Sequence, residues 1–446
     1  MMYSIEIFGA FDFLPKEVLI GTLEYERVKG NLSYRFQYDG SFLENFSAIS
    51  LSADLGKFLG LQAGNGGIFS FLSDALPDRW GRALIDKRER IEAELSNRIP
   101  RPFDDFGYLV KIDDFSRMGA LRFKNKDSYL GVHPGSDSVP PITTLDSFIR
   151  EAQQIEDAEA KGLPYNKSWI DNVWLPGSSL GGARPKLNVI DDNGNLFIAK
   201  IPSVKDTYDV ALWEHFACKL AKRAGITVAD SSILRVGPTP YHTLLSRRFD
   251  RKDGKRIHFA SSLTMIGFKD GDNATDGKGY IDIIDAMAGD IGVYALENNA
   301  AELFRRAAFN IFIGNHDDHF RNHGFLLREK GWKLSPAYDI NPSLYQTQVL
   351  AITPTTNNSS IKELFGAAEY YFLSSKDAEE IIREVLSGVE EWTQIAKNLQ
   401  ISETEQGRFS IRFQWAIKQA QALFPRKTKI VMRNISAKGK KNGHHW

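Results

Sequence analysis

The sequence predicts an α+β protein in which a β-rich N-terminal domain precedes two lobes, the second of them mostly helical. Three patterns support this class. Apolar and polar residues alternate over residues 4–28 and 32–38, as in half-buried antiparallel strands. Two apolar runs joined by a tight turn at 187–201 predict a β-hairpin, and an amphipathic helix follows at 210–224. Helical spacing then dominates residues 375–424.

The first domain changes from strands to helices along the chain. Residues 67–101 place Phe69, Leu72 and Trp80 at helical offsets. The following polar stretch is rich in turn-forming residues and ends at Pro140-Pro141, which predicts a connector. We therefore expect a β-rich domain at 1–125, a connector at 126–144, a lobe at 145–255, a helical lobe at 256–425 and a basic tail at 426–446.

The second lobe is predicted from its turns. Asn193-Gly194 supplies the positive φ angles of a type I′ turn between the two hairpin strands, and the second of these strands carries Lys200. The helix at 210–224 ends before Gly225, which suits a left-handed position that terminates a helix. A further strand pair is expected within residues 232–249.

The third lobe is expected to combine helices with one hairpin. Residues 276–313 have helical spacing, and a hairpin at 324–334 turns at Glu329-Lys330-Gly331. The stretch 426–446 carries seven Lys or Arg residues and no acid, which indicates a solvated terminus.

Composition excludes several classes of protein. With 42% hydrophobic residues, most of the chain is expected to fold. The 56 basic and 56 acidic residues cancel, so no overall field attracts nucleic acid or an anionic membrane. Cys218 is the one cysteine, which makes an internal disulfide impossible and a reducing cytoplasm the expected setting. We expect no membrane span and no export signal.

A glycine-rich segment stands directly before the predicted hairpin. It runs Gly177-Ser178-Ser179-Leu180-Gly181-Gly182-Ala183-Arg184-Pro185-Lys186. Glycines let backbone N–H groups approach an anion, which is how such loops hold phosphate. The segment lacks the Gly-Lys-Ser/Thr ending of a Walker A loop, and taken alone it also fits an ordinary flexible loop.

The order of elements favours the phosphate-binding alternative. The glycine-rich segment, a strand, a turn, a strand with Lys200 and a helix with Glu214 follow one another. Protein kinases build their nucleotide-covering lobe in this order, with the strand lysine on the phosphates and the helix glutamate orienting it. Lys200 lies within an apolar strand, where it is either an edge residue that reaches water or a buried charge with an anionic partner.

A second group of chemistry-bearing residues follows the long predicted helix. Asp317 and Asn322 are five residues apart, the interval between the catalytic aspartate and the metal-binding asparagine of kinases, and Asp339 follows one hairpin later. Phosphoryl transfer needs such a carboxylate for the attacking hydroxyl and oxygen ligands for Mg²⁺. A Zn²⁺ site at His316, His319 and His323 is an alternative, although it gives the glycine-rich segment no role.

These motifs resemble the HipA-type serine/threonine kinases, the toxins of bacterial toxin–antitoxin pairs. The resemblance covers nearly the whole chain. It is carried by Leu76-Pro77-Asp78, Trp80-Gly81-Arg82, Met118-Gly119-Ala120-Leu121-Arg122-Phe123, Ser179 to Lys186, Arg247-Arg248-Phe249-Asp250-Arg251, Asn315 to Asn322 and Tyr338-Asp339-Ile340. It implies a two-lobed, protein-kinase-like fold behind the N-terminal domain.

The resemblance also implies roles for single residues. Asp317 is expected to be the catalytic base, Asn322 and Asp339 the Mg²⁺ ligands, and Ser179 the autophosphorylated loop serine, with Ser178 as a neighbouring candidate. Phosphate on the loop is expected to switch the enzyme off by repelling nucleotide. The ATP contacts are expected at Ser179, Gly181, Gly182, Ala183, Lys186, Lys200, Arg247, Phe249, His319 and Asn322.

The implied function is an ATP- and Mg²⁺-dependent serine/threonine kinase that acts on a cytoplasmic protein, for which family substrates suggest an aminoacyl-tRNA synthetase. The implied partner is a helix-turn-helix antitoxin, through which DNA is reached only indirectly. Two alternatives stay open from the sequence. A small-molecule kinase would use the same residues, and a catalytically silent partner of an antitoxin–DNA complex would keep only the fold.

Overall fold

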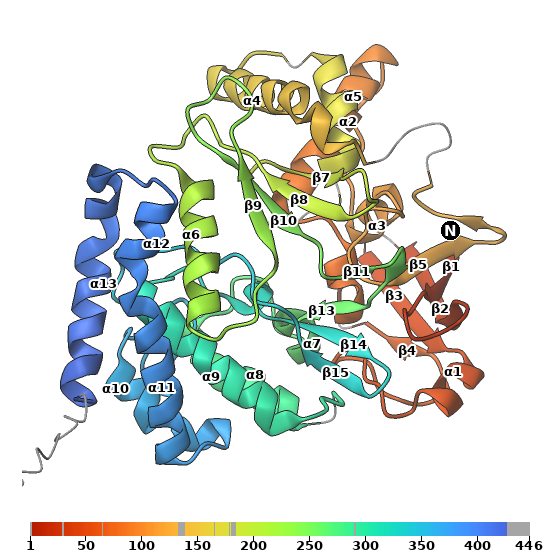
Figure 1. The fold of residues 1–446 in the computed structure, drawn as a ribbon. Coiled ribbons are helices and arrows are strands. Elements are labelled where there is room, and N and C mark those ends of the chain that lie inside the picture. Colours follow the sequence, from red (N-terminus) through yellow and green to blue (C-terminus); the bar gives the residue numbers. More distant parts are fainter. Residues whose placement is uncertain are drawn as a thin grey trace, which may run out of the picture.

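A computed structural model describes residues 2–28, 31–64, 66–132, 139–164, 166–177, 179, 184–289 and 291–425. It is a mixed α+β structure, so the predicted class is confirmed (Figure 1). The predicted basic tail lies outside the described residues, as do Ser178, Gly181, Gly182 and Ala183 of the glycine-rich segment. In the described part of the chain, no helix combines the length and the apolar character that a bilayer crossing requires.

The N-terminal region forms a six-stranded antiparallel sheet in the order β4-β3-β2-β1-β5-β6. The predicted alternation is present, because Ile5 and Ile7 of β1 are buried. Strand β5 comes from far along the chain and pairs with β1, which completes the sheet. The elements are β1 Met2–Gly9, β2 Val18–Val28, β3 Asn31–Tyr38, α1 Gly40–Asn45, β4 Gln62–Ala63, η1 Ser70–Ala75, α3 Asp105–Lys111, β5 Leu121–Asn125 and β6 Ser128–Tyr129.

Three helices gather at one end of the second sheet: α2 (Arg79–Leu95), α4 (Leu145–Lys161) and α5 (Lys167–Gly177) (Figure 1). Buried Trp80 and Leu84 of α2 share an apolar core with Leu187 and Ala199 of the sheet. Trp80 Nε1 also donates a hydrogen bond to the backbone oxygen of Lys186 at 3.1 Å. Helix α2 therefore supports the strands that carry the two lysines of the candidate site.

The second sheet has the order β7-β8-β10-β9 and packs against α6. Its hairpin is confirmed, but the predicted type I′ turn is wrong: of its two central residues, only Gly194 has a positive φ angle, 79°. The Asp191 side chain instead accepts hydrogen bonds from the backbone N–H groups of Asn193 and Asn195 and stabilises a longer loop. The elements are β7 Lys186–Ile190, β8 Leu196–Lys200, α6 Val210–Arg223, β9 Ser231–Leu234 and β10 Thr243–Arg247.

The C-terminal lobe is mostly helical, as predicted. The predicted helical stretch 276–313 contains two helices, α8 and α9, with Gly289 and Gly292 between them, and Gly292 has a left-handed φ of 78°. The main elements are β11 Arg251–Lys252, β12 Lys255–Arg256, β13 Phe259–Ser261, α7 Ser262–Ile266, α8 Tyr280–Ala288, α9 Leu296–Ile313, η4 Phe320–Asn322, β14 Gly324–Arg328, β15 Gly331–Leu334, α10 Ile361–Gly366, α11 Ser375–Glu390, α12 Trp392–Asn398 and α13 Glu403–Leu423.

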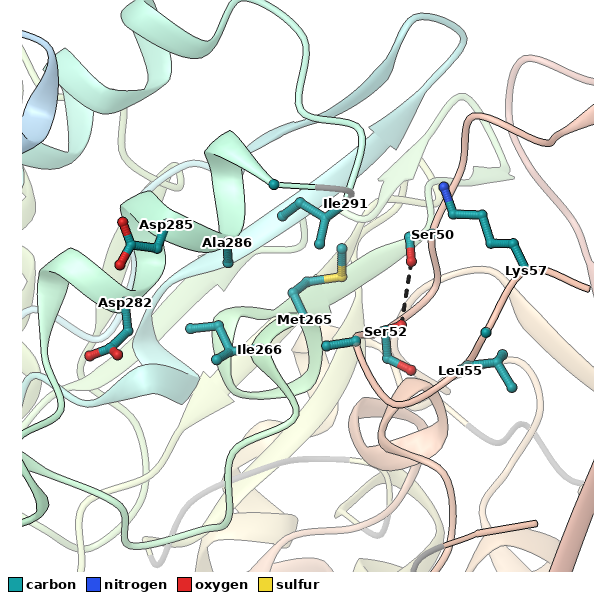
Figure 2. A pocket seen from close by; sticks show the side chains of 13 residues that line it. Ser50, Ser52, Leu55, Lys57, Met265, Ile266, Asp282, Asp285, Ala286 and Ile291 are labelled. Carbon is teal, nitrogen blue, oxygen red and sulfur yellow. Dashed lines mark hydrogen bonds between the residues drawn. The ribbon is translucent and has the colours of Figure 1, made fainter. Parts of the chain in front are cut away.

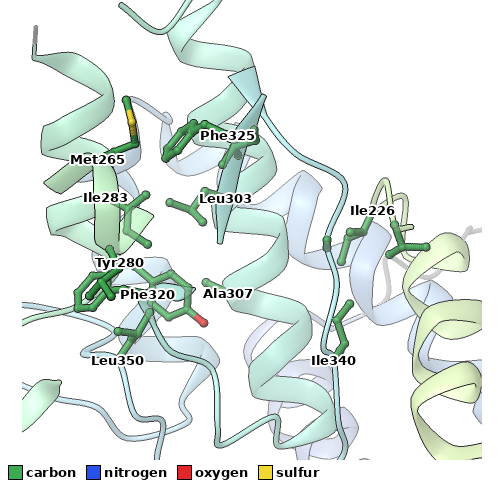
Figure 3. Packing of buried hydrophobic residues seen from close by; sticks show 14 of the residues in the cluster. Ile226, Met265, Tyr280, Ile283, Leu303, Ala307, Phe320, Phe325, Ile340 and Leu350 are labelled. Atoms are coloured by element: carbon green, nitrogen blue, oxygen red, sulfur yellow. The ribbon is translucent and has the colours of Figure 1, made fainter. Parts of the chain in front are cut away.

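Helix α9 lies in the centre of this lobe and is buried along most of its second half. Figure 3 shows Leu303 and Ala307 of α9 facing side chains of α8 and η4, among them Ile283 and Phe320. All four of these side chains are almost completely buried. The segment that follows α9, which carries the predicted catalytic residues, therefore begins from a rigidly packed helix.

Candidate active site

Lys200 joins three parts of the chain. It is the last residue of β8, and its ammonium lies 2.6 Å from Glu214 Oε1 on α6 and 2.7 Å from Asp339 Oδ1, which follows β15. Lys186 is its partner across the β7–β8 ladder. The structure thus brings together two lysines from the sheet, a helix carboxylate and the carboxylate predicted to bind a metal.

Charges in this group reinforce one another. Burial alone lowers the pKa of Lys200, but Asp339 and Glu214 outweigh it and raise that pKa above its ordinary value. Burial also opposes ionisation of Asp339, yet Lys200 and Lys186 hold its pKa well below the usual range. Burial lowers the pKa of Lys186 and raises that of Glu214. At neutral pH, a protonated Lys200 therefore faces an ionised Asp339.

Asp339 has an unusual backbone and a second polar neighbour. Its φ angle is 57°, in the left-handed region that few residues other than glycine adopt. Asn341 Nδ2 donates to Asp339 Oδ1 at 3.3 Å. Such backbone conformations persist where surrounding contacts fix them, and they are frequent at functional sites. The Asp339 side chain keeps 39% of its surface exposed, so a ligand can reach it.

The two aspartates after α9 differ sharply in environment. Asp317 is exposed, whereas Asp318 is only 2% exposed. Asn322 Nδ2 donates to the backbone oxygen of Asp317 at 3.0 Å, which ties the two ends of the segment together. Since its amide nitrogen is used in this way, Asn322 retains its amide oxygen for a ligand.

These side chains fit Mg²⁺ better than Zn²⁺. A carboxylate at Asp339 and an amide oxygen at Asn322 are ligands that Mg²⁺ prefers. Two of the three histidines of the zinc alternative are engaged elsewhere: His316 Nδ1 bonds the backbone oxygen of Thr347, and His323 Nε2 lies 2.8 Å from Asp318. Among the residues that the structure describes, no three His, Cys, Asp or Glu side chains gather as a metal-binding group.

His319 and Arg321, from the segment that follows α9, lie at the edge of the site. His319 is half-buried and near enough to Asp339 to help lower the pKa of that carboxyl. Arg321 Nε lies 3.0 Å from Asp270, and its guanidinium is 4.0 Å from Asp74 of the N-terminal region. Burial opposes the charge of Arg321, but Asp74 and Asp270 raise its pKa. The N-terminal region therefore reaches the rim of the site.

The predicted adenine contacts lie at the end of β10 and directly after it. Arg247 is exposed, its side chain bonds Asn195, and its backbone N–H donates to the carbonyl of Asp230 at 2.7 Å. That N–H is thus already used within the protein. Phe249 is half-buried, and its ring centroid lies 5.5 Å from that of Tyr338, the residue before Asp339. The phenylalanine therefore borders the site, while the arginine side chain points to the hairpin loop.

Ser179 is the one described residue within 178–183. Its hydroxyl bonds Ser116 and Asn188 rather than Lys186 or Lys200. Its hydroxyl is 3.0 Å from Ser116 Oγ and accepts a hydrogen bond from Asn188 Nδ2 at 2.9 Å. Ser179 is 7% exposed. The serine predicted to be phosphorylated is therefore held at the junction with the N-terminal region.

Sequence reasoning missed several residues around the site. Asn341 and Asp318 touch the predicted residues or hold their segment, and Ser116 binds the loop serine. Asn341 stands only two residues after Asp339, so its position was a usable signal. Nothing in the local sequence of Ser116 points to a partner 63 residues away.

A cavity of about 750 Å³ lies away from these residues, between the loop 50–57 and helices α7 and α8 (Figure 2). Ser52, Met265, Asp282 and Asp285 are among the residues that line it. None of the sequence-predicted site residues lines this cavity. We place the candidate site at Lys200 because the sequence-predicted lysines and the Asp339 carboxylate meet there.

Comparison with known proteins agrees with the geometry. Residues 12–124 match the family model of the HipA N-terminal domain, and residues 178–393 match that of the HipA-like C-terminal domain. The chain is similar to the serine/threonine-protein kinase toxin HipA of Shewanella oneidensis, with 27% identity over 260 residues, 52% of this chain and 55% of that relative. It is also similar to a putative kinase of Haemophilus influenzae, with 28% identity over 200 residues, 40% of this chain and 57% of that relative.

A solved complex of HipA, HipB and operator DNA from Shewanella oneidensis MR-1 contains a chain of similar fold. The TM-score is 0.57 at 17% identity, and the match covers 94% of this chain and 97% of that one. This chain thus shares the fold of that HipA chain over nearly its whole length. The chain belongs to the HipA family. Its matches span little more than half the length of the two relatives named above.

Proposed function

We propose that this protein is an ATP- and Mg²⁺-dependent kinase that phosphorylates serine or threonine in a protein. The contact of Lys200 with both Glu214 and Asp339 carries the proposal. A strand lysine paired with a helix glutamate and placed beside a metal-binding aspartate is the arrangement that kinases use to hold ATP phosphates. A catalytically silent partner would have no need of such a group.

Each predicted residue receives a role in this proposal. Asp317, being exposed, would accept the proton of the attacking hydroxyl. Asn322 and Asp339 would hold Mg²⁺, which neutralises charge on the phosphates when bound. Lys186 and Lys200 would bind phosphate oxygens, with His319 at the edge. Ser179, Gly181, Gly182 and Ala183 would cover the phosphates, and the chain from Arg247 to Phe249 would contact adenine.

The substrate and the partner are proposed from the family. A HipA relative is described as a serine/threonine-protein kinase toxin, and a HipA of similar fold has been solved with HipB and operator DNA. We therefore propose a protein substrate, with an aminoacyl-tRNA synthetase as the candidate, and a helix-turn-helix antitoxin as partner. The zero net charge of this chain fits indirect DNA binding through that partner.

The experiment that tests the proposal compares variants of the two site aspartates with a variant of an exposed aspartate outside the site. Asp317→Ala and Asp339→Ala should each lower phosphate transfer from ATP by about 10²- to 10⁴-fold, because a positioned base or a metal ligand is lost. Asp192→Ala, which removes an exposed carboxylate in the hairpin loop, should leave transfer unchanged.

Labelled ATP incubated with purified protein and bacterial lysate gives the measurement. Label should enter a protein band with the wild type and with Asp192→Ala only. Full transfer by Asp317→Ala would contradict the proposal. Label that enters only small molecules would instead favour the small-molecule kinase.

A further inference from the structure

Asp318, next to the proposed base, is a buried carboxylate held by several hydrogen-bond donors. Its carboxylate oxygen Oδ2 lies 2.8 Å from His323 Nε2 and accepts hydrogen bonds from Asn310 Nδ2 at 3.0 Å and from the hydroxyl of Tyr280. Asp318 and Tyr280 are almost completely buried. A buried carboxylate with several donors fixes the backbone that carries it, and here that backbone belongs to the segment of Asp317.

Hydrogen bonds between asparagines connect Asp318 to Asp339 on the other side of the site. Asn315 Nδ2 donates to Asn310 Oδ1 at 3.2 Å, and Asn315 Oδ1 accepts the backbone N–H of Asn341 at 3.3 Å. Asn341 Nδ2 then donates to Asp339 Oδ1 at 3.3 Å. Hydrogen bonds therefore run from buried Asp318, through three asparagines, to the carboxylate that faces Lys200.

Several members of this network line one small space. A cavity of about 10 Å³ is lined by polar side chains and by apolar residues of α9 and of the segment before Asp339. The cavity lining includes the polar side chains of Arg306, Asn310, Asn315, Asp318, Asn322 and His323. Since Asn322 shares this space, both proposed metal ligands, Asn322 and Asp339, contact or adjoin the network.

We infer that Asn310, Asn315, Asn341 and Asp318 are positioning residues for phosphoryl transfer, which set Asp339 and the segment of Asp317 in one geometry. This inference rests on the proposed function and deepens it. None of the four is placed to accept the substrate proton, because Asp318, Asn310 and Asn315 are buried and Asn341 faces Asp339. Outer partners of metal ligands typically contribute 10- to 100-fold in activity or metal affinity.

The test uses Asn315→Ala, Asn341→Ala and the double variant, with Asn299→Ala as matched control. Asn299 lies on α9, the helix that carries Asn310, and its side chain makes hydrogen bonds to the backbone of Tyr294 and Leu334, but it is outside the network. We expect each single variant to lower kcat about 10- to 100-fold and to raise the Mg²⁺ concentration needed for half-maximal rate, while KM for ATP changes little. Asn299→Ala should keep the kcat and Mg²⁺ dependence of the wild type.

The double variant shows whether the two asparagines act together. The kcat of the double variant should lie only slightly below that of the single variant with the lower kcat. Loss of one asparagine already interrupts the hydrogen-bond network, so a second loss adds little. Losses that multiply, or single variants whose kcat and Mg²⁺ dependence equal those of an active wild type, would overturn the inference alone. A wild type without phosphate transfer would overturn the proposed function, and this inference with it. Asn341 is only half-buried, so Asn341→Ala decides the question if Asn315→Ala does not fold.

Discussion

Two largely buried polar clusters link separate segments of this protein, and they differ in the groups that form them. The network around Asp318 links two carboxylates, Asp318 and Asp339, mostly through neutral amide and hydroxyl groups. The second cluster, here called the hinge cluster, consists of Arg248, Asp250 and Arg251 together with residues 115–119. It joins parts of the chain more than 125 residues apart.

The hinge cluster depends on charge. Asp250 is 1% exposed and bonds Arg248 at 2.6 Å, Arg251 at 2.7 Å and the backbone N–H of Gly119 at 2.8 Å. Burial lowers the pKa of Arg251 to about 9, while the two arginines hold the pKa of Asp250 far below its usual range, against the effect of burial. The comparison teaches that hydrogen bonds among mostly neutral groups arrange the segment of Asp317, whereas buried ion pairs dock the N-terminal region onto residues 248–251.

The largest effect on stability is expected from removing the central charge of the hinge cluster. Asp250→Ala should lower the free energy of unfolding by about 3–5 kcal/mol, because it leaves two arginines buried without their carboxylate. Urea denaturation followed by fluorescence measures this change. The exposed Asp192→Ala serves as control and should differ from wild type by less than about 0.5 kcal/mol. A similarly small change at Asp250 would show that the cluster does not dock the N-terminal region.

A pH dependence is expected from His258, which packs between Phe11 and Trp332 beside the hinge cluster. Burial lowers the pKa of His258 to about 3. Below about pH 6.5 this histidine binds a proton in the unfolded chain but stays neutral in the folded protein. The free energy of unfolding therefore falls as the pH decreases from 6.5 towards 3. One such group contributes at most about 1.4 kcal/mol per pH unit.

The matched measurement is chemical denaturation of wild type and His258→Gln at pH 7, 6 and 5. The variant should lose stability less steeply on acidification. Some slope should remain, because burial also lowers the pKa of His215 to about 4. Equal slopes in both proteins would contradict a buried neutral histidine at this junction.

A smaller effect is expected at Ser179, whose hydroxyl bonds Ser116 of the hinge cluster. Ser179→Ala should cost about 1 kcal/mol of stability, the usual contribution of a buried hydrogen-bonded hydroxyl. If Ser179 is the autophosphorylated residue, it must first leave this position, so phosphate should appear on the peptide from Trp174 to Arg184 and be absent in Asp317→Ala.

Mass spectrometry of the active protein tests this prediction, with Ser178 as the other acceptor in the same peptide. Phosphate added there should weaken ATP binding through repulsion between like charges. Phosphate found only elsewhere, or unchanged nucleotide affinity after modification, would contradict the proposed switch.

The smallest effect is expected at Arg247, whose exposed side chain donates a hydrogen bond to Asn195 Oδ1. Arg247→Ala should change the free energy of unfolding by less than about 0.5 kcal/mol, and KM for ATP should stay at the wild-type value if adenine is bound through the backbone. A large rise in KM would assign this side chain to nucleotide recognition and separate Arg247 from its structural neighbour Arg248.

Much of the fold could be read from the sequence because it depends on local patterns. Alternation predicted β1 to β3, and helical spacing together with Gly225 predicted α6. The break between α8 and α9 escaped the same reasoning, since spacing alone does not reveal that Gly292 approaches the backbone of Ala48, which a Cβ would meet at 2.7 Å. The turn at Gly194 was misjudged because the Asp191 side chain stabilises a longer loop.

The sequence by itself determined the chemistry that this protein can offer: the order of Lys200, Glu214, Asp317, Asn322 and Asp339, and the intervals that resemble a kinase. Only the tertiary structure decided which groups meet. It placed Lys200 between two carboxylates, buried Asp318 beside exposed Asp317, and held Ser179 against Ser116. The physical reason is that periodicity records which face of an element is buried, whereas the partners of a buried charge are chosen by packing between distant segments.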